Sequence, residues 1–197
     1  MARSQRSAMD RRMALGGVLA GAGGLALPHL QSRTVTQRGM VGGGQVRVGE
    51  REAQFSVFAS RLIFDADTPE VVVGRVLWVE AARGVTMRST QVVMYRVVEM
   101  PSDQGQGREL FGTMRVTDEA AYPFYLLLID VGPAGSGQDT VSLTVGDGAR
   151  QADSVTPVWG LGFSYAVAGL VVSGDVQVIN LEIDPVAGVS RPAPPPR

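Results

Sequence analysis

Cysteine is absent from the 197-residue sequence, and histidine occurs once, at His29. The lack of cysteine excludes disulfide bonds, thiolate metal sites, cysteine nucleophiles and the lipid-bearing cysteine of a lipoprotein. A single histidine near the amino terminus argues against a Ser-His-Asp triad, a histidine zinc site and a histidine general base. The sequence therefore excludes most familiar hydrolytic mechanisms.

Lysine is also absent, so that all 18 basic residues are arginine, and the formal net charge is −1. A chain with balanced charge and no basic patch in its body lacks the electrostatic signature of a protein that binds nucleic acid. We therefore expect no nucleic-acid partner. The hydrophobic content of 45% is enough for one domain with a core, whereas a second domain does not fit comfortably.

Residues 1–30 have the layout of an export leader. A basic stretch precedes the apolar run 13–27, which is shorter than the roughly 20 apolar residues of a membrane-spanning helix. The pair Arg11-Arg12 before this glycine-rich run resembles the twin-arginine leader family, which implies the twin-arginine export machinery as a partner. Small residues predict cleavage by signal peptidase after Ala26, leaving a mature form without a transmembrane helix. The general secretory route and an uncleaved helix that packs on the domain are the alternatives.

The rest of the chain divides by composition into three segments. Residues 31–44 carry four glycines and predict a flexible linker. Residues 45–184 predict a β domain, and the proline-rich residues 185–197 predict a disordered tail.

The body of the chain has the two-residue period of β-strands. Apolar and polar residues alternate over 107–116 and 140–145, as in half-buried strands. The stretches 53–64 and 70–80 are rich in β-branched and aromatic residues and flank the turn signal at 65–69, which predicts a hairpin.

Two breaks in this alternation predict curvature. Adjacent apolar residues at Val92-Val93 predict a bulge, and a similar phase slip lies at Val178-Ile179. The nearly apolar run 122–131 predicts a central strand that is covered on both faces. We therefore expect an all-β fold, an antiparallel β-sandwich or a β-barrel-like domain.

The run from Tyr122 to Val145 resembles the closing hairpin of an uncharacterised β-domain family of secreted and cell-surface bacterial proteins. In that pattern a Y-x-F strand leads into a D-x-G turn, a glycine-rich loop, a G-x-D-T segment and an alternating strand. The resemblance implies an exported β domain and no catalytic residue. The residues that carry it are Tyr122, Phe124, Asp130, Gly132, Gly137, Asp139 and Thr140.

Asp130 and Asp139 flank a loop rich in glycine, and two hypotheses apply to them. Carboxylates on such a loop provide the oxygen ligands that calcium prefers. Alternatively, each Asp accepts backbone N–H bonds and shapes its turn. The loop lacks the dense D-x-D-x-D spacing of dedicated calcium sites, which favours the second interpretation. No other cofactor is expected.

Two further hypotheses concern polysaccharide. A glycoside hydrolase needs two carboxylates that face one sugar, and the candidates are Glu80, Glu99, Glu109 and Glu182. A carbohydrate-binding module presents aromatic rings to its sugar ligand. In one form of this hypothesis, calcium stabilises the module. Trp159, Phe163 and Tyr165 are the candidates for such a ligand surface, because Gly160 and Gly162 interrupt any regular strand there.

These observations favour a noncatalytic β-sandwich domain that acts in binding or assembly. The leader predicts that it is exported to the periplasm, the cell surface or the medium, where an envelope component or polysaccharide is its expected ligand. The alternatives are a carboxylate-dependent polysaccharide hydrolase and a calcium-stabilised carbohydrate-binding module. A cleft with convergent carboxylates would favour the enzyme, and a bare sheet edge or an exposed aromatic patch would favour binding or self-association.

Overall fold

The computed structural model describes residues 34–64, 67–101, 103–117, 120–184 and 189–193. The predicted leader, its Arg11-Arg12 pair and its cleavage site lie outside the described residues. Within these ranges, no helix is long and apolar enough to cross a membrane.

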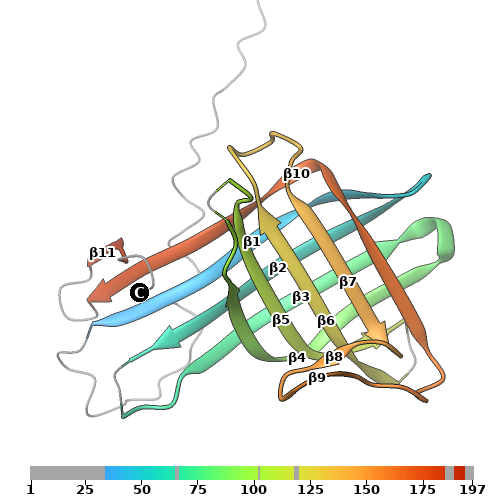
Figure 1. The fold of residues 1–197 in the computed structure, drawn as a ribbon, viewed down its shortest axis with the longest axis horizontal. Coiled ribbons are helices and arrows are strands. Elements are labelled where there is room, and N and C mark those ends of the chain that lie inside the picture. Colours follow the sequence, from blue (N-terminus) through green and yellow to red (C-terminus); the bar gives the residue numbers. More distant parts are fainter. Residues whose placement is uncertain (1–33, 65–66, 102, 118–119, 185–188, 194–197) are drawn as a thin grey trace, which may run out of the picture.

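Eight strands form one antiparallel sheet that closes on itself (Figure 1). Each strand pairs with the next along the chain as far as β7, which pairs with β10, and β10 returns to pair with β1. The all-β prediction is confirmed, and closure makes the fold barrel-like rather than a two-sheet sandwich. The strands of the barrel are β1 (Val35–Val48), β2 (Arg51–Ile63), β3 (Val71–Glu80), β4 (Val85–Val98), β5 (Gln106–Val116), β6 (Ala121–Asp130), β7 (Thr140–Gly146) and β10 (Ser164–Asp184).

Side chains fill the interior of the barrel. The predicted alternation over 107–116 and 140–145 is confirmed, because alternate residues of β5 and β7 point inward and are buried. The predicted hairpin over 53–64 and 70–80 is also confirmed, as β2 and β3. The predicted strand at 122–131 corresponds to β6, whose inner face is buried and whose outer face is half-buried. The largest fully buried side chains include Trp78, Phe124, Met40, Met87, Leu110, Met114, Leu126, Leu128 and Leu143.

The prediction of a flexible linker over 31–44 is wrong for residues 35–44, which form most of β1. Their glycines serve close packing rather than flexibility. A Cβ atom at Gly44, where φ is +152°, would overlap the carbonyl oxygen of Ser173 on β10. A Cβ atom at Gly174 of β10 would in turn overlap the carbonyl oxygen of Gly43. These contacts let β1 and β10 meet and close the barrel.

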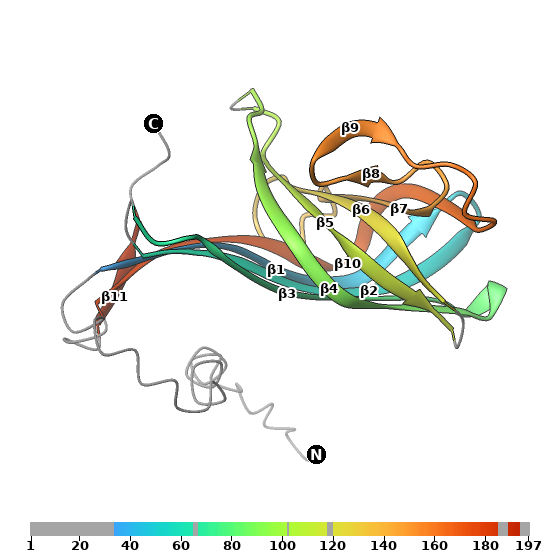
Figure 2. The ribbon, with the colours of Figure 1, turned by 90° about the horizontal axis from the view of Figure 1, so that it is seen from below.

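Four strands continue beyond the barrel as a flatter sheet, which we call the wing (Figure 2). It begins where β4 and β7 stop pairing with β3 and β10, and a short strand, β11 (Val189–Pro192), pairs with the end of β10. The tail predicted for 185–197 is therefore ordered in part. The wing consists of residues 35–41 of β1, 58–63 of β2, 71–75 of β3, 177–184 of β10, and β11.

One of the two predicted bulges is confirmed. The register of β4 against β5 shifts between Ser89 and Gln91 and again between Val92 and Met94, beside the predicted position. The slip predicted at Val178-Ile179 is wrong, because the irregularity between β1 and β10 lies earlier, opposite Gln45 and Val46. Both faces of the wing carry apolar side chains at this point, and this produced the appearance of a slip in the sequence.

A small hairpin covers the outside of the barrel. It is formed by β8 (Arg150–Gln151) and β9 (Ser154–Pro157), which lie over β5 and β6 (Figure 2). A 3-10 turn, η2 (Ala81–Arg83), connects β3 to β4 and ends at Gly84 in the left-handed conformation.

Candidate functional site

One edge of β3 is unpaired over part of its length. Strand β4 pairs with β3 only from Leu77 to Glu80 and then turns away at its bulge. Over residues 71–75, β2 is the one strand among those the structure describes that pairs with β3. We call the unpaired side of residues 71–75 the β3 edge; it is the side of the wing opposite β11 (Figure 1). Unpaired strand edges are templates for pairing with another chain.

The β3 edge is apolar and exposed. Val71 is 42% exposed and Val73 is 40% exposed, although most valines of such a fold are buried. Natural proteins usually protect an exposed edge with charge, proline or a bulge. Here Pro69 precedes the segment and Arg75 ends it, and the three residues 71–73 between them are all valine.

The outer face of the wing adds apolar surface beside this edge. Val41, which is 39% exposed, lies opposite Phe58, and Val73 lies opposite Ser60. A cavity of about 330 Å³ adjoins this face and contains no carboxylate among the residues that line it. Those residues are Ser56, Phe58, Arg75, Val76, Leu77 and Arg88.

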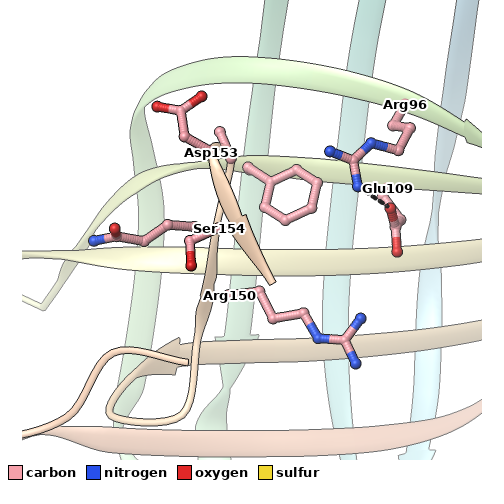
Figure 3. Close-up of a pocket in the computed structure, with 8 residues that line it drawn as sticks. Arg96, Glu109, Arg150, Asp153 and Ser154 are labelled. Carbon is pink, nitrogen blue, oxygen red and sulfur yellow. Dashed lines mark hydrogen bonds and ion pairs between the residues drawn. The ribbon is translucent and has the colours of Figure 1, made fainter. Parts of the chain in front are cut away.

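A smaller cavity, of about 130 Å³, lies beneath the β8–β9 hairpin (Figure 3). It contains two carboxylates, Glu109 and Asp153, but the carboxylate of Asp153 points away from that of Glu109 in Figure 3. Ligand pockets usually have volumes of about 300–1,000 Å³, so this cavity is too small for a polysaccharide segment.

Glu109 is engaged by its neighbours in that cavity. The hydroxyl of Tyr125 donates a hydrogen bond of 2.8 Å to Oε1, and Nη1 of Arg96 lies 3.5 Å from Oε2. Burial and this bond to a carboxylate raise the pKa of Tyr125 to about 12. Arg150 lies over the Tyr125 ring, at 5.4 Å from its centroid. The cluster joins the hairpin to the barrel.

A second polar cluster lies in the barrel interior. Nε1 of Trp78 donates to the hydroxyl of Tyr165 at 2.7 Å, and this hydroxyl donates to Oε2 of Glu80 at 2.8 Å. Nη1 of Arg51 lies 2.6 Å from Oε1 of the fully buried Glu80, an ion pair without hydrogen-bond alignment. Burial, and the bond to Glu80, raise the pKa of Tyr165. The arrangement pairs a buried charge, and none of its four residues lines either of the two cavities described above.

A third polar cluster consists of Tyr95 and the arginines near it. Nε of the buried Arg108 donates to the Tyr95 hydroxyl at 2.7 Å. Arg38 and Arg61 lie directly opposite each other on β1 and β2, and Arg61 is paired with Glu70. Burial raises the pKa of Tyr95, against the lowering effect of the three arginines.

The four carboxylates considered for a hydrolase occupy separate places. Glu80 is in the barrel core, Glu99 is exposed after β4, and Glu182 is on the wing. Of the four, Glu109 alone lines one of the two cavities described above.

Asp130 and Asp139 lie at the seam between β6, β7 and β10, where they accept backbone hydrogen bonds. Oδ1 of Asp139 accepts from the N–H of Val131 at 2.8 Å, and Oδ2 accepts from the N–H of Val176 at 3.0 Å. Oδ2 of Asp130 accepts from the N–H of Val178 at 3.1 Å. Burial raises the pKa of Asp130, and the carboxylates of Asp139 and Asp175 raise it further. These bonds match the second of the two hypotheses for this loop.

The structure separates the three aromatic residues predicted to form a ligand surface. Tyr165 is buried in the core, where its hydroxyl bonds Glu80. Phe163 is half-buried and stacks on Tyr122 with 4.8 Å between ring centroids. Trp159 is 71% exposed. A sugar platform needs several coplanar exposed rings, and these three do not provide one.

Within the described ranges, no group of three or more His, Cys, Asp or Glu residues is placed to hold a metal ion. Comparison with models of protein families, with curated proteins and with solved structures finds no match.

The sequence pattern does not reveal the β3 edge. Residues 70–80 were correctly predicted to form a strand, but a single sequence does not indicate which strands remain unpaired on one side. The one available signal was the bulge near Val92, because a bulge turns a strand away from its neighbour.

Proposed function

We propose that this chain is an exported, noncatalytic β-barrel domain that acts in binding or assembly at the cell envelope or outside the cell. The β3 edge supports the proposal: it offers unpaired backbone groups and two exposed valines, Val71 and Val73. Addition of a strand to such an edge is a recurrent mode of recognition, in which main-chain hydrogen bonds provide much of the affinity. The leader pattern around Arg11-Arg12 supports export.

A binding function also agrees with the cavities. The barrel interior is packed with side chains, so it offers no ligand chamber of the kind found in open barrels. The larger cavity has no carboxylate, and the two carboxylates of the smaller one diverge. Neither cavity provides the two facing carboxylates, roughly 5–10 Å apart, that a glycoside hydrolase requires.

The proposal is tested by blocking the edge. Val73→Lys places a charge on the edge, and Val41→Lys is the matched control, because Val41 is equally exposed on the same face but lies on a fully paired strand. The exported protein is mixed with the envelope fraction of the producing cell and sedimented. We expect the wild type and Val41→Lys to assemble or to sediment with the envelope, and Val73→Lys to stay in solution.

Two results would contradict the proposal. One is identical behaviour of Val73→Lys and the wild type. The other is release of reducing sugar from envelope polysaccharide by the wild type, with loss of that activity in Glu109→Gln, which would establish the hydrolase instead.

A further inference from the structure

We propose that the β3 edge pairs with the same edge of a second copy of this chain, antiparallel and two-fold symmetric, with Val73 opposite Val73 of the other copy. The inference rests on the proposed function and names the partner.

The direction of the backbone groups along β3 follows from one hydrogen bond. The N–H of Val76 donates to Oγ of Ser89 on β4, at 2.8 Å, so the backbone groups of Val76 point to the side away from β2. Backbone N–H and C=O groups alternate between the two sides of a strand from one residue to the next. The groups of Val72 and Gly74 therefore also point away from β2, along the β3 edge.

This direction fixes the register. A two-fold axis perpendicular to the sheet keeps the same face of both copies on the same side. Residues directly opposite each other in an antiparallel pair point to the same face. An even-numbered residue must therefore lie opposite an even-numbered one, and an odd-numbered residue opposite an odd-numbered one. When Val72 lies opposite Gly74 of the other copy, Gly74 also lies opposite Val72 of the other copy. These two hydrogen-bonded pairs form four hydrogen bonds. Moving the strands by two residues in one direction would face Val72 with Val76, whose N–H is already bonded to Ser89. Moving them in the other direction would place Val72 opposite itself and each Gly74 opposite Glu70, which precedes β3 and is already paired with Arg61.

The favoured register is also self-complementary in its side chains. It brings Val73 against Val73, and it places each Arg75 opposite Val71 rather than opposite the other Arg75. Like charges directly opposite each other would destabilise the pair. Glu70, which borders the segment, is already paired with Arg61. The segment is therefore a suitable partner for its own copy.

The first experiment exploits the absence of cysteine from the sequence. In the predicted register, Val73 and its copy form a non-hydrogen-bonded pair, with Cα atoms about 4.5 Å apart, within the range of a disulfide. Val73→Cys is purified as the full chain, oxidised mildly and analysed on a non-reducing gel. We expect a covalent dimer. Val41→Cys, with almost the same exposure on the same face, controls for random collision and should stay monomeric.

A mixing experiment tests the register. In this register Val71 lies opposite Arg75 of the other copy, four residues away from Val71 of that copy. The two Val71 Cα atoms are therefore roughly 14 Å apart along the strands, too far for a disulfide. The same holds for Arg75. Val71→Cys alone and Arg75→Cys alone should therefore not cross-link, whereas an equimolar mixture of the two should. Cross-linking of Val71→Cys alone, with none in the mixture, would overturn this register.

A charge exchange provides a measurement without covalent capture. The masses of Val73→Lys and Val73→Glu are measured by light scattering at high concentration, separately and mixed. We expect two monomers when separate and a heterodimer when mixed, with circular dichroism confirming that both variants are folded. Self-pairing is overturned if Val73→Cys cross-links no more than Val41→Cys. If this occurs while Val73→Lys still abolishes association with the envelope, the self-pairing inference fails and the proposed function stands.

Discussion

The seam of the barrel gives the most quantitative prediction, at Asp139. This carboxylate is 5% exposed and accepts two backbone N–H bonds, from Val131 at 2.8 Å and from Val176 at 3.0 Å. In Asp139→Asn the amide has one acceptor oxygen, so its NH₂ group faces a backbone N–H and leaves a buried donor without a partner. An unsatisfied buried donor costs about 1–3 kcal/mol, and a hydrogen bond to a charged group contributes about 1.5–3 kcal/mol.

We therefore expect Asp139→Asn to lower the free energy of unfolding by about 2–3 kcal/mol. For a domain of this size that change lowers the Tm by roughly 4–12 °C. Differential scanning calorimetry and urea unfolding at pH 7 measure both quantities.

Asp130→Asn is the matched control, because the structure gives Asp130 one backbone bond, from Val178 at 3.1 Å. An asparagine oxygen still accepts that bond, as a weaker neutral one, and the substitution removes a partly buried charge, which offsets part of the loss. We expect a change well below that of Asp139→Asn. Equal effects of the two substitutions, or none at Asp139, would refute the reasoning. A chelator should leave the Tm of the wild type unchanged, whereas a calcium site at these carboxylates would make the chelator lower it.

Three other predictions concern the core, pH dependence and export. Tyr165→Phe leaves the carboxylate of Glu80 and the Trp78 indole without their shared partner, and we expect urea unfolding to show a loss of about 2–4 kcal/mol. The pKa of Tyr125 is about 12 in the folded protein against 10.0 for a free tyrosine, so the contribution of this residue to stability should be constant below pH 10 and fall between pH 10 and 12. In a Tyr125→Phe variant, the free energy of unfolding, measured as a function of pH, should fall less between pH 10 and 12 than in the wild type. Replacing Arg11 and Arg12 together by Lys should stop export through the twin-arginine route, as cell fractionation would show, and unchanged export would indicate the general secretory route.

The parts of the fold that depend on local pattern could be predicted from the sequence. Alternation over 107–116 and 140–145 predicts which face of each strand is buried, and the adjacent apolar residues Val92-Val93 predict the bulge of β4. These features need no information about distant residues.

The parts that depend on contacts distant in sequence could not be predicted. Gly44 and its neighbours have the composition of a linker, but they are needed because Ser173 of β10 lies against them. Glu80 gives no sign in the sequence that its partners are Tyr165 and Arg51. The β3 edge exists because β4 departs from β3, which is a property of the closed sheet rather than of either strand.

Hydrogen exchange at the amides of Val72 and Gly74 tests the central claim most directly. These N–H groups point away from β2 and should exchange rapidly in dilute monomer. If the β3 edge is the assembly surface, both amides should become protected as protein concentration rises, while those of Val71 and Val73, already bonded to β2, should change little. Rapid exchange of both amides at every concentration, and also in the presence of the envelope fraction, would contradict the account.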